Sequence, residues 1–193
     1  MPEQKTMNGV DTAKLQQVIS AIKDNPELAA FKFRARNHWL GGTHCRTTIK
    51  DFYGMSQEDT SRKQPFVLEC DEPAPLLGED HGPNATEAAL YALTSCLLTT
   101  FVFQAAAKGV KIEQLDVVAE GHLDLRGFLG LSKGVRRGFT NIDVTFHVKC
   151  NASEEQIEEL CRLAQKYSPV FDTVSNPVKV NVRVQTPATA EAK

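Results

Sequence analysis

The feature that most constrains this chain is a run of twenty residues without a charged side chain, from Ala88 to Ala107. Its ends resemble helix ends: Asn84 suits an N-cap, Glu87 completes a capping box, and Gly109 suits the C′ position. Apolar side chains fall on every face of such a helix rather than on one stripe, and this pattern requires burial all round. The sequence therefore predicts one long, buried central helix.

The same run is long enough to cross a bilayer, so a membrane span is the alternative interpretation. Five of its residues are Thr, Ser or Gln, and its flanks carry neither an aromatic belt nor a positive bias on one side. The rest of the chain is typical of soluble, amphipathic elements. We therefore expect the core helix of a soluble protein with no membrane partner, and a second subunit would help to bury it.

Charge and cysteine usage exclude several classes of protein. The chain has 22 Lys and Arg against 24 Asp and Glu and no basic block beyond Arg136-Arg137, so we expect no nucleic-acid partner. Its five cysteines include no C-x-x-C pair and no signal peptide precedes them, which indicates a reducing, cytoplasmic location. The five histidines lack H-x-x-x-H spacing and the glycines of 127–138 open no helix, so we expect neither a metal nor another cofactor.

Hydrophobic periodicity divides the chain into strands and helices. Asp11 or Thr12 caps a first helix that ends near Lys23, and alternating residues then predict strands over 31–39, 43–53 and 65–70 as an antiparallel meander. After the central helix we expect strands over 114–125 and 142–148, a helix over 153–167 with its own capping box, and a closing strand over 178–184.

This order has no regular βαβ alternation, so the fold class is α+β. We expect an N-terminal helical extension over 1–29, one domain over 30–185 and a disordered tail over 186–193. A chain of this length can bury about 70% of its unfolded surface.

Three motifs carry a resemblance to a known family. The first is Gly82-Pro83-Asn84-Ala85-Thr86-Glu87, with Cys96 nine residues after the glutamate. The second is Trp39-Leu40-Gly41-Gly42-Thr43-His44. The third is Tyr167-Ser168-Pro169-Val170. Over about residues 31–184 the chain resembles the OsmC/Ohr family, in its general OsmC-like branch, to which Cys70-Asp71-Glu72-Pro73 also points. The resemblance implies an OsmC-like fold, with antiparallel sheets around a long buried central helix, and an intertwined homodimer whose sites lie at the subunit interface. It also implies a role in oxidative-stress defence.

The resemblance assigns roles to individual positions. Cys96 stands where peroxidase members of the family keep the cysteine that attacks an organic hydroperoxide. Ser168 stands at the resolving-cysteine position, and a serine cannot form the disulfide. The family arginine falls at Thr43 and the assisting glutamate at Thr86.

Neighbouring residues are the substitutes that we expect at such a site. His44 and Arg46 follow Thr43, and Glu87 follows Thr86, so the candidate catalytic residues are Cys96, Arg46, His44 and Glu87. Apolar burial disfavours a thiolate, and the helix dipole acts only within the terminal turn. Activation therefore requires a cation delivered by tertiary structure, from His44, Arg46 or the 126–137 loop.

Two functions remain open. The chain is either a thiol-dependent organic hydroperoxide reductase that uses Cys96 and an external thiol reductant, or a non-catalytic homodimer that binds a small hydrophobic molecule. We interpret the other cysteines as core thiols, with Cys45 as the first backup because it adjoins His44. They are Cys45, Cys70, Cys150 and Cys161.

Overall fold

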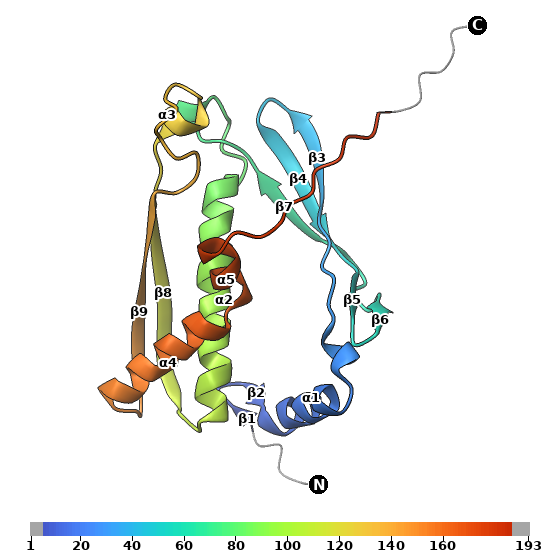
Figure 1. Ribbon diagram of the computed structural model, residues 1–193, viewed down its shortest axis with the longest axis vertical. Helices are drawn as coiled ribbons and strands as arrows, with labels where there is room; N and C mark the ends of the chain where they lie inside the picture. Colours follow the sequence, from blue (N-terminus) through green and yellow to red (C-terminus); the bar gives the residue numbers. More distant parts are fainter. Residues whose placement is uncertain (1–5, 187–193) are drawn as a thin grey trace, which may run out of the picture.

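The uncharged run forms a single long helix, α2 (Ala85–Ala107), in the computed structural model, which describes residues 6–186 (Figure 1). The Asn84 side chain accepts a hydrogen bond from the Glu87 backbone, and the Glu87 carboxylate accepts one from the Asn84 backbone. Gly109, just beyond the other end, has a φ of 72°, which glycine adopts without a steric penalty. The predicted helix and its caps are confirmed.

Three further elements pack against α2 in the C-terminal half. Strands β8 (Ile112–His122) and β9 (Asn141–Cys150) form an antiparallel hairpin, whose tip carries the short helix α3 (Leu125–Phe128). Helix α4 (Glu154–Tyr167), with its predicted capping box, and α5 (Pro169–Ser175) follow. Helices α4 and α5 and strand β8 pack along α2, and Phe146 of β9 adds its ring to Phe101 of α2. Their core cluster consists of Phe101, Ala105, Val110, Leu160 and Ala164.

The N-terminal half is built around an antiparallel sheet in the order β3 (Arg36–Gly41), β4 (His44–Ile49) and β7 (Phe66–Cys70). Helix α1 (Thr12–Asp24) is capped by Asp11 as predicted. The remaining elements are β1 (Thr6–Met7), β2 (Val10–Asp11), η1 (Pro26–Ala29), β5 (Phe52–Gly54), β6 (Gln57–Asp59) and η2 (Ala74–Leu76).

The predicted meander is confirmed, but two of its strands have different bounds. Residues 31–35 precede β3, and Lys32 makes only an isolated bridge with Tyr53. The predicted strand over 43–53 divides into β4 and β5, because β5 leaves the three-stranded sheet and pairs with β6 instead. The fold class, α+β, is confirmed.

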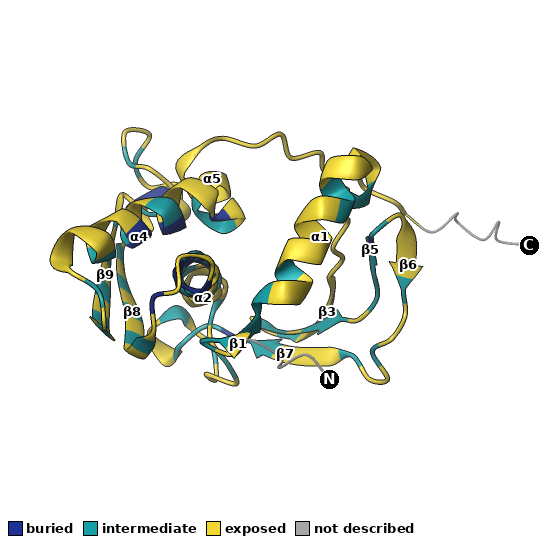
Figure 2. Cartoon of the chain, turned by 90° about the horizontal axis from the view of Figure 1, so that it is seen from below, coloured by how far each residue is buried: buried dark blue, intermediate teal, exposed yellow. Residues whose placement is uncertain are grey.

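Burial of α2 on every face, as the sequence predicts, does not occur within this chain. Its buried side chains are Leu93, Leu97, Phe101, Ala105 and Ala106, which form one stripe (Figure 2). The stripe is narrow because α4, α5 and β8 cover one side of the helix only. By length and composition α2 could also cross a membrane. The core helix of a folded domain meets the same criteria, and α2 has a packed stripe of this kind.

The predicted closing strand is wrong within a single chain. Residues 177–186 form neither helix nor strand, and Val178, Val180, Val182 and Val184 are between 54% and 86% exposed. A strand needs a hydrogen-bonding edge beside it, and no edge of the described sheets pairs with this segment. Residues 187–193 of the predicted tail lie outside the described residues.

The chain also buries less surface than its length allows. Its accessible surface is 14,852 Å². A compact monomer of this mass exposes about 9,100 Å², and its unfolded chain about 31,000 Å². The single chain thus hides about half of its unfolded surface rather than the expected 70%. Part of this shortfall lies in apolar side chains that nothing in residues 6–186 covers, such as Phe33, Trp39 and Val182.

Candidate functional site

Cys96 lies near the middle of α2, on the flank of its buried stripe. The residue is half-buried, while its neighbour Leu97 is 1% exposed. The carbonyl of Cys96 accepts a hydrogen bond of 2.8 Å from the Thr100 hydroxyl. Within residues 6–186, the sulfur itself takes part in no hydrogen bond or ion pair. Cys96 is therefore only partly covered at the edge of the core, and no cation of residues 6–186 is bound to its thiol.

The two candidate cations, His44 and Arg46, lie together on β4 and share one carboxylate. Glu69, directly opposite Arg46 on β7, lies 2.7 Å from Arg46 Nε and 2.8 Å from His44 Nε2. Hydrogen bonds from Arg46 first and His44 second lower the pKa of the Glu69 carboxyl. The structure brings these two predicted residues together, but it places them on a carboxylate rather than on Cys96.

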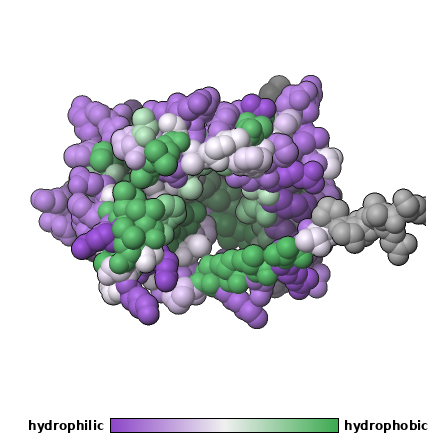
Figure 3. Space-filling model, turned by 90° about the horizontal axis from the view of Figure 1, so that it is seen from above, coloured by the Kyte–Doolittle hydropathy of each residue, from purple (hydrophilic) through white to green (hydrophobic). Residues whose placement is uncertain are grey.

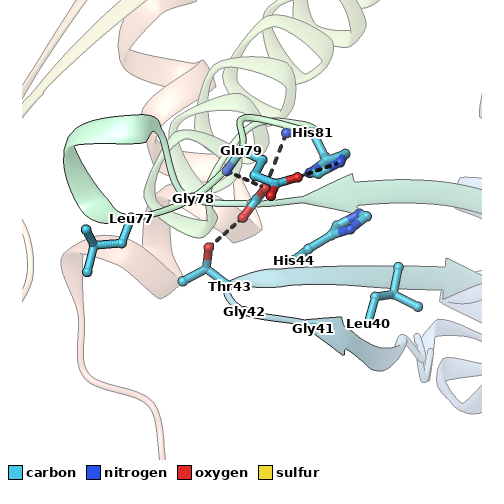
Figure 4. A pocket seen from close by; sticks show the side chains of 10 residues that line it. Leu40, Gly41, Gly42, Thr43, His44, Leu77, Gly78, Glu79 and His81 are labelled. Carbon is cyan, nitrogen blue, oxygen red and sulfur yellow. Dashed lines mark hydrogen bonds and ion pairs between the residues drawn. The ribbon is translucent and has the colours of Figure 1, made fainter.

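A pocket of about 340 Å³ beside this cluster holds a buried carboxylate, that of Asp71 (Figure 4). Asp71 is 2% exposed and accepts hydrogen bonds from the Thr43 hydroxyl at 2.6 Å and from the backbones of Glu72 and Glu79. His81 Nδ1 lies 2.8 Å from the same carboxylate. Hydrogen bonds from Thr43 first and His81 second hold the pKa of Asp71 well below its usual range.

The rings of His81 and His44 stack face to face, with centroids 4.1 Å apart and planes 3° from parallel. The hydrogen bond between His81 and Asp71 raises the pKa of the His81 imidazole. The pocket can therefore exchange protons and orient a small polar group at two imidazoles. The described residues contain no group of three His, Cys, Asp or Glu side chains that could hold a metal ion.

Glu87 and Ser168 have local structural roles. Glu87 caps α2 nine residues before Cys96, hence about 13 Å along the axis and on the opposite helix face. Ser168 is 1% exposed, ends α4, and accepts a hydrogen bond from the Phe171 backbone at the start of α5. The structure does not bring Glu87 to Cys96.

Three members of this polar cluster escaped the sequence analysis: Glu69, Asp71 and His81. The register of β4 and β7 would have placed Glu69 beside Arg46, because directly opposite residues share a sheet face. Asp71 and His81 meet because the 71–84 loop folds back, and no spacing in the sequence indicates that contact.

A family profile described as "OsmC-like protein" matches residues 78–183, which is more than half of the chain and includes both Cys96 and Ser168. The chain belongs to the OsmC-like protein family. The family that its sequence motifs resemble is thus confirmed, and Cys96 lies within the matched segment.

Solved structures agree on the fold. An OsmC-like protein from Mycoplasma pneumoniae is 19% identical, with a TM-score of 0.58, over 80% of this chain and 96% of that chain. A protein from Legionella pneumophila, described as an organic hydroperoxide resistance protein OsmC, is 18% identical with a TM-score of 0.50, over 76% and 90%. The comparison with curated protein sequences found no match.

Proposed function

We propose that this OsmC-like protein is a thiol-dependent organic hydroperoxide reductase that acts through Cys96 as a homodimer in oxidative-stress defence. The observation that carries the proposal is the family match across Cys96, in a helix that leaves this thiol at an uncovered edge of the core. The Legionella relative described as an organic hydroperoxide resistance protein supports the same substrate class.

The reaction at Cys96 is a two-electron transfer. The Cys96 thiolate attacks the terminal oxygen of the hydroperoxide, an S–O bond forms, the O–O bond breaks, and the alcohol leaves with a proton. The resulting sulfenic acid is reduced by an external dithiol, which becomes a disulfide and releases water. Ser168 at the resolving position supports an external reductant, and five free cysteines fit a reducing cytoplasm.

Uncovered apolar surface supports the homodimer. The accessible surface exceeds that of a compact monomer by about 5,700 Å². Subtracting the whole unfolded-chain surface of the twelve residues outside 6–186, about 1,900 Å², leaves a remainder of about 3,800 Å². The remainder is ample for an obligate homodimer, whose interface buries about 2,000–5,000 Å² in total. Figure 3 shows a face with a hollow, apolar side chains around it, and an apolar strip that runs to grey terminal atoms.

The dimer would also complete the site. Cys96 has no cation partner among the described residues of its own chain, whereas the Arg46 side chain is 49% exposed beside Glu69. We therefore assign the activating cation to the Arg46 cluster of the second subunit. A charge within about 4–6 Å of the sulfur would favour the thiolate.

Turnover of cumene hydroperoxide with a dithiol tests the proposed activity. The Cys96→Ser variant should lose at least about 100-fold in rate, as expected when a covalent nucleophile is removed. Cys150→Ser, which removes a thiol packed against the core, is the matched control and should keep the wild-type rate. Equal rates for wild type and Cys96→Ser, with a Cys96 thiol inert to peroxide, would remove Cys96 from the chemistry and overturn this proposal.

Mixed dimers test whether the site is shared between subunits. Cys96→Ser and Arg46→Ala chains are each inactive alone under this proposal, but a mixed dimer holds one intact site. Unfolding the two together and refolding them should restore about a quarter of wild-type activity, because half of the dimers are mixed and each has one working site of two. No recovery would place Arg46 and Cys96 of the same chain in one site and contradict the shared arrangement.

A further inference from the structure

Two cysteines outside the proposed peroxidase site face each other across the N-terminal sheet. Cys45 on β4 pairs directly with Cys70 on β7. Directly opposite residues in an antiparallel pair point to the same side of the sheet, so the two thiols are neighbours. Both residues are half-buried, and both are free thiols. No spacing motif in the sequence predicts this pair, because 24 residues separate its two cysteines.

The spacing of the two strands suits a disulfide. Directly opposite residues in an antiparallel ladder have Cα atoms about 4.5–5.5 Å apart. Disulfides form at Cα separations of about 4.4–6.8 Å. A bond between Cys45 and Cys70 therefore requires side-chain rotation rather than movement of the strands.

The surroundings give the two sulfurs different roles. The Asn37 side-chain amide donates a hydrogen bond of 3.2 Å to Cys45 Sγ and so fixes its position. Burial first, and then the adjoining Cys45 thiol, raise the pKa of Cys70. Because the Asn37 amide donates to Cys45 Sγ, we take Cys45 as the sulfur that attacks and Cys70 as its partner.

A pocket beside this pair is lined by Cys70 and by Asn37, the residue whose amide bonds Cys45 Sγ. Cys70 lines a pocket of about 500 Å³ whose other walls include Leu68, Pro83, Ala88 and Tyr91, at the start of α2. Cys150 and Cys161, by contrast, pack against the core of the C-terminal half. Among the described cysteines, only Cys45 and Cys70 are opposite each other in the strand register.

We propose that Cys45 and Cys70 form a second redox site, a cross-strand dithiol that an organic hydroperoxide converts into a disulfide independently of Cys96. In the first step the Cys45 sulfur attacks the terminal peroxide oxygen, the O–O bond breaks, and the hydroperoxide leaves as an alcohol. In the second step the Cys70 sulfur attacks the Cys45 sulfenic acid, the S–S bond forms and water leaves. Two thiols are oxidised, one hydroperoxide is reduced, and an external dithiol reverses the change.

The test uses the full-length Cys96→Ser variant, so that its result does not depend on the proposed function. Cumene hydroperoxide should lower its free thiols from four to two, and a dithiol should restore all four. Trypsin then releases peptides 37–46 and 64–108, which in this variant contain Cys45 and Cys70 as their only cysteines. The proposal predicts that these two peptides are linked after oxidation. Four remaining thiols, or unlinked peptides, would overturn it.

Further substitutions in the same background separate the two thiols. With Cys70→Ser added, the Cys45 sulfenic acid should persist and react with dimedone, and no linked peptide should form. Labelling of Cys70 in the converse Cys45→Ser variant, at the rate seen for Cys45, would contradict the assignment of attack to Cys45. Adding Cys150→Ser is the control, which should leave the linkage unchanged.

Discussion

The two halves of this molecule differ in where they put their apolar side chains. Every buried apolar residue of the described chain lies between Leu93 and Ala164, in the half built on α2. In residues 6–84 the buried residues are Gly54 and Asp71, while Phe33 and Trp39 are 74% and 70% exposed. One half thus has its own core, and the other has apolar surface but no core. The homodimer proposed above would cover the apolar surface that residues 6–186 leave exposed in the N-terminal half.

Ion pairs do not compensate for the missing core of the N-terminal half. Pairs such as Arg34 with Glu58 lie at the surface with side chains about half exposed, whereas the pair of His81 with the buried Asp71 is an exception. Exposed pairs contribute about 0–1 kcal/mol each. The sheet and α1 must therefore gain most of their stability from burying apolar faces, and the C-terminal valines are available for the same purpose.

The largest effect is expected in the half that has a core. Phe101 is fully buried against Phe146, so Phe101→Ala should lower the free energy of unfolding by about 3–5 kcal/mol. Thr99→Ala is the control on the same helix, because Thr99 is exposed and bonds only its own helix. Urea unfolding measures both variants. A change below about 1 kcal/mol for Phe101→Ala would break the contrast between the halves.

Acidic residues in the C-terminal valine segment should separate the subunits. Val180→Asp with Val182→Asp would bury unpaired charges at the interface and weaken the dimer by about 3 kcal/mol or more, over 100-fold in dissociation constant. Asn181→Asp adds an acidic residue on the alternate side of the extended segment and should change little. Sedimentation velocity measures the dimer fraction of the double variant and of Asn181→Asp. A double variant that dimerises as strongly as the wild type would show that this segment does not lie in the interface.

The polar cluster of the N-terminal half should reveal itself through pH. The pKa of Asp71 is lowered, so its stabilisation is complete above about pH 4 and is lost as pH falls below that value. The pKa of His81 is raised, so its stabilisation is complete below about pH 6.5 and is lost as pH rises through the raised value. The stability lost in Asp71→Asn should therefore be greatest between about pH 4 and 6.5.

Urea unfolding of Asp71→Asn and wild type at about pH 3, 5.5 and 9 gives this profile. Asp80→Asn in the same loop is the control, because Asn also tolerates the positive φ of 59° found there. A difference between wild type and Asp71→Asn that stays constant with pH would contradict the role given to the Asp71–His81 pair.

The smallest effects concern the cap of α2. Asn84→Ala should cost about 1 kcal/mol of stability through the lost N-cap. Glu87→Gln keeps a capping-box residue without the charge and should leave hydroperoxide turnover unchanged, because Glu87 lies far from Cys96. Turnover that falls about tenfold or more in Glu87→Gln would instead give this residue a part in the chemistry.

Local signals account for what the sequence predicted well. The caps of α1, α2 and α4 involve residues three positions apart, so their side chains meet whatever the rest of the fold does. Most strands were likewise predicted from a local signal, the alternation of apolar and polar residues along the chain. The family match then confirmed the family that these motifs indicated.

Non-local contacts account for what it missed. The Cys45–Cys70 pair required the register of two strands, and the Asp71–His81 contact required the path of a loop. Burial of α2 on all sides and a paired strand over 178–184 require surfaces that this chain does not contain. Both patterns of hydrophobic residues belong, in our account, to the assembled dimer rather than to one chain.

The mass of the protein in solution tests that account most directly. Sedimentation equilibrium of the wild-type chain at micromolar concentration should give twice the chain mass of 21.3 kDa. A mass of 21.3 kDa under these conditions would show that the uncovered apolar faces are stable in a monomer, and it would contradict the completion of this fold by a second copy.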